Sequence, residues 1–114
     1  MRKLIALSLL ITLVLVACAS LSYPVESALY DTNDQACQTA YDSLLRAKSA
    51  GQLTHDQDVA VGLIVADVKA ADSLVFDDLE AWRSTGKMPA TYLENVRQLR
   101  HAQGELIFLA GEVR

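Results

Sequence analysis

The stretch THDQDVAVGLIVA, residues 54–66, decides how this chain folds. Its last eight residues are continuously apolar or Gly, and so short a run fits a buried strand as well as a helix. The residues before it favour a helix, because Thr54 and Gln57 have the spacing of a capping box, in which two side chains satisfy backbone N–H groups at a helix start. Residues 67–72 continue with helix formers and no turn residue. We therefore predict a helix over about residues 55–84.

This predicted helix is apolar nearly all round. A helix of that kind has to be covered on more than one side. We therefore expect it to lie between two other helices or in an interface between copies of the chain. One heptad-spaced row contains Val75, Leu79 and Trp82, which we expect in the core. The alternative is a hydrophobic patch that faces a partner protein.

Apolar residues at alternating spacings of three and four predict two further helices, one over about residues 32–50 and one over about 89–112. Pro89 is expected in the first turn of the later helix, where its missing N–H costs no hydrogen bond. Short turns join the three helices, so successive helices run in opposite directions. The fold class expected for residues 31–114 is therefore all-α, a small antiparallel three-helix bundle.

The N-terminal segment has the layout of an export signal. Two basic residues precede a run of 13 apolar or weakly polar residues, Leu4–Val16. As a helix this run reaches roughly 20 Å, short of the roughly 30 Å hydrocarbon core of a bilayer. It ends in Leu15-Val16-Ala17-Cys18, which resembles the lipobox of bacterial lipoproteins. The resemblance implies cleavage between Ala17 and Cys18, a diacylglyceryl group on the Cys18 thiol and usually acylation of the freed amine.

This resemblance divides the chain into three parts. Residues 1–17 form the signal helix, residues 18–30 the lipidated Cys and a flexible tether, and residues 31–114 the helical domain. As a flexible coil the tether would reach roughly 20 Å. Two other interpretations stay open: an ordinary secretory signal cleaved after Ala19, and an uncleaved anchor that spans the membrane over residues 4–21.

The residue after the lipid-bearing Cys sets the expected destination. Asp at this position is the usual inner-membrane retention signal of Gram-negative lipoproteins, and this chain has Ala19 instead. The resemblance therefore implies an outer-membrane anchor that faces the periplasm in a Gram-negative cell. In a Gram-positive cell the same anchor would hold the protein on the outer leaflet of the plasma membrane.

The chain that would remain after cleavage is acidic. It holds all 14 acidic residues and 8 of the 10 basic ones, which is a formal net charge of −6. Such a domain has no basic footprint for nucleic acid and no basic patch for anionic headgroups. We therefore expect no nucleic-acid partner, and membrane attachment through the lipid on Cys18.

Cys37 is the one cysteine left once Cys18 carries lipid, so an intramolecular disulfide is impossible in that form. Its place on the apolar stripe of the first predicted helix indicates a small buried hydrophobe. The alternative is a reactive thiol or an intermolecular disulfide. No cysteine or basic residue stands beside Cys37 in the sequence to activate the thiol, so we favour the buried hydrophobe.

No group of residues forms a recognisable chemical site. His55, Asp56 and Asp58 are close in sequence, but adjacent helical positions point to different faces, so we expect no metal there. His101 lies four residues before Glu105 and is expected in an exposed pair. The densest acidic cluster is Asp77-Asp78-Glu80, which we expect as a solvated helix face. Motifs for nucleophilic catalysis and phosphate binding do not occur in the sequence, so we expect no enzyme activity and no cofactor, and we infer no small-molecule substrate.

These observations predict a lipid-anchored protein of the cell envelope that acts as a non-enzymatic interaction or structural module. Its partner would be another envelope protein or a second copy of the chain, since heptad spacing permits self-association. One alternative rests on a general resemblance to small lipoproteins of phages and prophages, some of which act in lysis or in the exclusion of other phages. A second alternative is an ordinary secreted or membrane-anchored helical protein. The helical domain itself carries no motif of a named family.

The lipid anchor gives the first testable prediction. Cells that express the protein and are fed labelled palmitate should incorporate the label into it, and Cys18→Ala should lose the label. Gel mobility of the two proteins checks processing at the same time. An unlabelled wild-type protein that keeps the size of the precursor would contradict the anchor.

Overall fold

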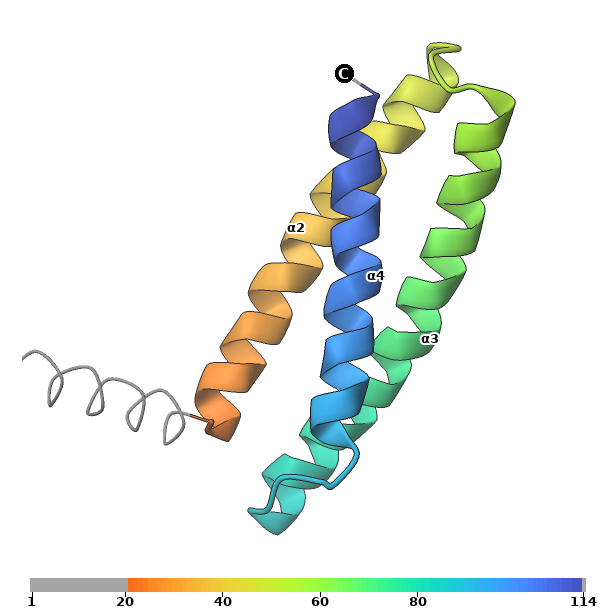
Figure 1. The fold of residues 1–114 in the computed structure, drawn as a ribbon. Helices are drawn as coiled ribbons and strands as arrows, with labels where there is room; N and C mark the ends of the chain where they lie inside the picture. The colour runs from red at the N-terminus through yellow and green to blue at the C-terminus, as the bar shows by residue number, and fades with distance from the viewer. Residues whose placement is uncertain (1–20, 114) are drawn as a thin grey trace, which may run out of the picture.

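The computed structural model describes residues 21–113, which form three helices: α2 (Tyr23–Ser49), α3 (His55–Thr85) and α4 (Tyr92–Glu112). No strand occurs within the described range. α2 and α4 run in the same direction, and α3 runs against both (Figure 1). The predicted all-α, antiparallel three-helix bundle is therefore confirmed.

The stretch at residues 54–66 begins α3 as predicted. The N–H of Gln57 donates to Oγ1 of Thr54 at 3.1 Å, and the N–H of Thr54 donates to Oε1 of Gln57 at 2.9 Å, which completes the capping box. At the other end, Gly86 adopts a φ of 74° and its N–H donates to the carbonyl of Trp82 at 2.8 Å. This left-handed conformation favours glycine and ends the helix.

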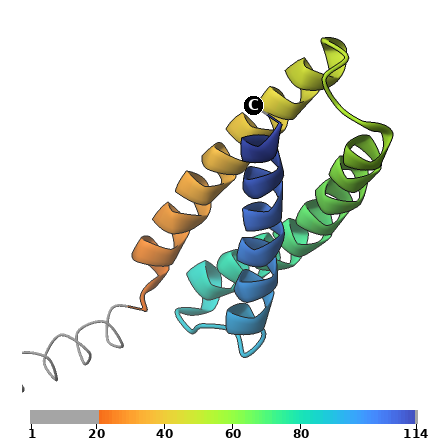
Figure 2. The ribbon, with the colours of Figure 1, turned by 45° about the horizontal axis from the view of Figure 1, so that its top comes forward.

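The helix between the other two is α4, and not α3 as we expected. α4 packs along both neighbours, whereas α2 and α3 touch only weakly. Both views show α4 lying across the gap between α2 and α3 (Figures 1 and 2). Val59 and Leu63, in the first turns of α3, stay 49% and 65% exposed. α4 packs against both α2 and α3, and the first turns of α3 are therefore covered on one side only.

The core consists of two hydrophobic clusters stacked along the bundle. The cluster near the α3–α4 turn contains Ala71, Val75, Leu79, Trp82, Tyr92, Val96 and Leu99. The cluster toward the other end contains Cys37, Ala40, Leu44, Val61, Leu106 and Ala110. Gln103 lies on α4 between the two clusters, is 3% exposed, and its Nε2 has no hydrogen-bond partner among the described residues. A buried amide without a partner costs stability, so the core is weakest at this level.

Val75, Leu79 and Trp82 belong to this core and not to a partner-facing patch. Their exposed fractions are 0%, 5% and 7%. Tyr92 packs edge-on against Trp82 with ring centroids 5.2 Å apart, and Tyr23 approaches the same indole at 6.2 Å. The partner-facing alternative is therefore wrong, because α4 and the start of α2 cover this face of α3.

α2 begins at Tyr23, well before the predicted start near residue 32. Pro24 occupies the first turn, where no N–H is required. The N–H of Glu26 donates to the carbonyl of Ser22 at 3.0 Å and closes the first helical turn. The flexible tether predicted over residues 18–30 is therefore wrong from Tyr23 onward.

The sequence contains a signal for this longer helix. Tyr23, Glu26, Tyr30 and Asn33 continue the alternating spacing of three and four that leads to Cys37. The prediction missed it because two of these inward positions are polar. The remaining N-terminal predictions, namely the signal helix over residues 1–17, cleavage between Ala17 and Cys18, and lipidation of Cys18, lie outside the described residues.

An ion pair between the buried Glu26 and the partly exposed Arg100, whose side chain is 43% exposed, holds the start of α2 on α4. Nη2 of Arg100 lies 3.2 Å from Oε2 of Glu26, whose side chain is 5% exposed. The nearby Tyr92 hydroxyl is buried without a hydrogen-bond partner among the described residues. Burial, followed by the charge of Glu26, raises the pKa of Tyr92 to about 12. A carboxylate removed from water in this way depends on its cation.

α4 begins at Tyr92, later than the predicted start near Pro89. Pro89 lies in the preceding turn, and its carbonyl accepts a hydrogen bond from the N–H of Tyr92 at 3.1 Å. Asp78 of α3 holds this turn, since its carboxylate accepts from Oγ1 of Thr91 at 2.9 Å and from Nδ2 of Asn95 at 2.8 Å. The helix thus begins where Asp78 supplies polar contacts and a negative charge at its N-terminus.

The Glu26–Arg100 pair predicts that replacing Arg100 destabilises the bundle more than replacing Arg97, which is also on α4. Arg100→Met should lower the free energy of unfolding by about 1.5–3 kcal/mol, because hydrogen bonds to charged groups contribute on this scale and Glu26 stays buried. Arg97→Met is the matched control, since the Arg97–Glu94 pair is 69% and 57% exposed, and its loss should be much smaller. Urea unfolding followed by circular dichroism measures both. Equal losses would contradict a special role for the Glu26–Arg100 pair.

Candidate interaction groove between α3 and α4

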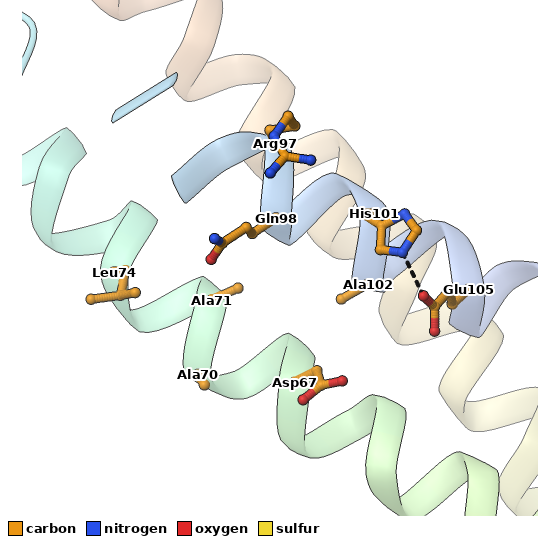
Figure 3. A pocket seen from close by; sticks show the side chains of 9 residues that line it. All are labelled: Asp67, Ala70, Ala71, Leu74, Arg97, Gln98, His101, Ala102 and Glu105. Carbon is orange, nitrogen blue, oxygen red and sulfur yellow. Dashed lines mark ion pairs between the residues drawn. The ribbon is translucent and has the colours of Figure 1, made fainter. Parts of the chain in front are cut away.

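A shallow groove of about 370 Å³ runs between α3 and α4 on the described part of the bundle. Three alanines line it, the exposed Ala70 and the buried Ala71 of α3 and the buried Ala102 of α4, and their small side chains leave the space open. Figure 3 shows the longer side chains that border it from the two helices. These are Asp67 and Leu74 of α3, and Arg97, Gln98, His101 and Glu105 of α4.

The α4 side of the groove is organised by pairs within the helix. Nε2 of His101 lies 2.6 Å from Oε1 of Glu105, and the two side chains are 75% and 47% exposed, so the predicted exposed pair is confirmed. Gln98 donates to Glu94 at 3.1 Å. Asp67 stands across the groove on α3 and forms no ion pair with a described residue (Figure 3). The groove therefore has a small apolar lining and a mixed, solvated polar rim.

The groove is open along its length. Its titratable side chains are Asp67, Arg97, His101 and Glu105. Its walls come from two helices only, so a small ligand would stay open to solvent along the groove. Enclosed sites for small molecules bury most of the ligand surface. A side chain from a partner helix would need no such enclosure.

Two apolar side chains extend the groove beyond its polar lining. Leu63 is 65% exposed and Phe108 is 69% exposed, more than any other large hydrophobic side chain in the described range. Leu63 stands one turn before Asp67 on α3, and Phe108 one turn after Glu105 on α4. Residues three or four apart share a helix face, so both side chains lie in line with the rims of the groove.

The sequence analysis did not predict the α3–α4 groove, although the residues that line it have helical spacing. The rows Leu63-Asp67-Ala70-Leu74 and Gln98-His101-Glu105-Phe108 both follow helical spacing. Neither row is apolar throughout, so neither stands out as an amphipathic stripe. Nothing in the sequence says that these two rows face each other across a groove.

Comparison with known proteins adds no assignment. No family model, no curated protein and no solved structure shows a significant match to this chain. None of the three described helices combines the length and hydropathy needed to cross a bilayer.

The histidine and acidic residues at the start of α3 do not gather into a metal site. Asp58 pairs with Lys48 of α2, with Nζ 3.0 Å from Oδ1. His55 and Asp56 are exposed. Across residues 21–113, no three His, Cys, Asp or Glu side chains lie together in a way that could hold an ion.

The three acidic residues of the cluster Asp77-Asp78-Glu80 have different surroundings. Asp77 is exposed, as predicted. Glu80 pairs with Arg83 at 2.8 Å. Asp78 instead binds Thr91 and Asn95, so the predicted solvated face is wrong for this residue. The reason is the turn into α4, which brings two side-chain donors to the Asp78 carboxylate.

Cys37 lines a smaller cleft of about 170 Å³ between α2 and α3. It is 5% exposed and belongs to the core, so the predicted buried hydrophobe is confirmed. Burial, followed by the charges of Asp34 and Asp72, raises the pKa of the Cys37 thiol. Burial and the charges of Asp72 and Asp31 also raise the pKa of Asp34. The surroundings thus disfavour the thiolate, which is the reactive form.

The buried environment of Cys37 predicts that its thiol reacts slowly with an alkylating reagent. In a protein whose Cys18 is lipidated or replaced by Ser, Cys37 should react with iodoacetamide at pH 8 much more slowly than an exposed thiol, because the core hinders access of the reagent and the raised pKa lowers the thiolate fraction. The control is the exposed neighbour on the same helix, Gln38→Cys in a Cys37→Ala background. Mass spectrometry over time gives both rates. Equal rates in the folded proteins would contradict the buried thiol.

Proposed function

We propose that this protein is a lipid-anchored, non-enzymatic interaction module of the bacterial cell envelope, and that it binds its partner through the α3–α4 groove. The observation that carries the proposal is that Leu63 and Phe108 are 65% and 69% exposed and have the helical spacing of the residues that line the α3–α4 groove. Each would gain about 1.5–3 kcal/mol from complete burial against a partner. Phe is enriched at protein interfaces, so Phe108 would be the main anchor and Leu63 would add apolar contact area.

The composition of the groove indicates the kind of partner. Interfaces combine apolar and polar contacts, and here Leu63 and Phe108 would supply the apolar contacts at one end of the groove. Asp67, His101 and Glu105 would form the rim. An amphipathic helix with apolar residues at spacings of three, four and seven fits a groove between two helices. Another envelope protein or a second copy of this chain would supply it.

The proposed location rests on the N-terminal sequence. Leu15-Val16-Ala17-Cys18 resembles a lipobox, and Ala19 after it favours transfer to the outer membrane in a Gram-negative cell. The acidic chain that would follow Cys18 offers few cations to hold anionic lipids. Lipid on Cys18 therefore supplies the membrane attachment in this proposal, and two or three acyl chains make a stable anchor.

The test is crosslinking in living cells with a photoreactive amino acid at Leu63 or Phe108. Both positions should trap the same protein, because both have the helical spacing of the residues that line one groove. Leu45, which is 42% exposed on α2 and lies outside the groove, is the matched control and should trap much less. The mass of the adduct tells a second copy from another protein. No adduct at either groove position, or equal adducts at Leu45, would contradict the proposal.

A further inference from the structure

The start of α2 and the residue before its N-cap carry an apolar surface that the bundle does not use. Val25 and Leu29 of α2 are four residues apart and are 47% and 42% exposed, and Leu21, four residues before Val25 and just outside the helix, is 45% exposed. Residues with this spacing share one face of a helix. The described chain therefore presents a small hydrophobic stripe at the point where it leaves the N-terminal segment.

We propose that this stripe lies in the headgroup layer of the lipid bilayer and forms a second membrane contact beside the lipid on Cys18. The inference rests on the proposed lipid anchor. It differs from the α3–α4 groove in both place and partner, since the stripe belongs to α2 and its proposed partner is the bilayer.

The length of chain before α2 supports this contact. Only residues 19–22 separate Cys18 from Tyr23. Five steps of extended chain reach at most about 17 Å, and the polar layer on each side of a bilayer is about 5–8 Å thick. A lipid on Cys18 would thus keep Leu21 and Val25 within reach of the headgroups. The tether expected from the sequence would have allowed the domain to stand farther away.

The charges near the stripe also favour a lipid interface. Between residues 21 and 30 Glu26 is the one Asp, Glu, Lys or Arg, and it points inward to Arg100 at 3.2 Å. The outward face of these turns therefore carries no charge that would have to lose water. Thr32, at the end of the stripe, donates its hydroxyl to the carbonyl of Ala28 at 3.0 Å. Helices that lie at membrane surfaces bury an apolar face of this kind.

The stripe is fixed to the bundle, so a contact at this point orients the domain. Tyr23 packs on Trp82, and Glu26 is paired with Arg100. The α3–α4 turn lies at the same end of the bundle as the start of α2 (Figures 1 and 2). This turn exposes Met88 and Lys87, an apolar and a cationic side chain that both suit a headgroup layer.

The experiment places a fluorescent reporter on the full-length protein, processed in cells through its own signal. In a Cys37→Ala background, a single cysteine at Val25 or Leu29 carries the polarity-sensitive dye NBD. Leu45→Cys is the matched control, because Leu45 is 42% exposed on the same helix, as Leu29 is, but lies at the far end of α2. The proteins are reconstituted into vesicles of phosphatidylethanolamine and phosphatidylglycerol at about 3:1, with or without nitroxide-labelled headgroups.

NBD at Val25 and Leu29 should shift to the blue and be quenched by the nitroxide headgroups, whereas NBD at Leu45 should stay water-like. Val25→Asp should reverse the shift at Leu29 while circular dichroism stays unchanged. Equal, water-like spectra at Leu29 and Leu45 would overturn the inference. A blue shift without nitroxide quenching, or one that depends on the protein-to-lipid ratio, would also overturn it and indicate a protein neighbour.

Mass spectrometry of the same samples separates this inference from the proposed function. A lipidated Cys18 with a water-exposed label at Leu29 overturns the membrane contact alone. An unmodified Cys18 overturns the lipid anchor and, with it, the contact that rests on the anchor.

Discussion

The inner face of α4 is the constraint on which the rest of the structure depends. α2 and α3 touch each other less than either touches α4, so most of the packing that holds each of them in the bundle is with α4. Leu99 belongs to one core cluster and Leu106 to the other, and the buried Gln103 lies between them. The two clusters are therefore joined along one helix, with a polar level in the middle that contributes less to stability than the levels on either side.

A second constraint ties the start of α2 to this face. The Glu26–Arg100 pair and the Tyr23–Trp82–Tyr92 stack make the first turns of α2 part of the bundle and not part of a tether. With a lipid on Cys18, the domain would stand close to the bilayer. The proposed groove lies on α3 and α4, so membrane attachment and partner binding would use different helices.

Sequence reasoning succeeded where neighbouring residues decide the outcome. The capping box at Thr54 and the exposed His101–Glu105 pair both depend on side chains a few positions apart. It failed where a distant residue decides. Glu26 resembles a residue of a polar tether until Arg100 is placed beside it, and Asp78 resembles a solvated acid until the turn brings Thr91 to it.

The sequence by itself determined that the chain forms three helices, where α3 begins and ends, and that Cys37 is buried, because capping and apolar periodicity are local properties. Only the tertiary structure decided that α4 lies between the other helices, that α2 begins at Tyr23, and that Asp67 of α3 and His101 of α4 line one groove. The physical reason is distance along the chain. Glu26 and Arg100 are 74 residues apart, and periodicity within one helix does not specify which face of another helix it will meet.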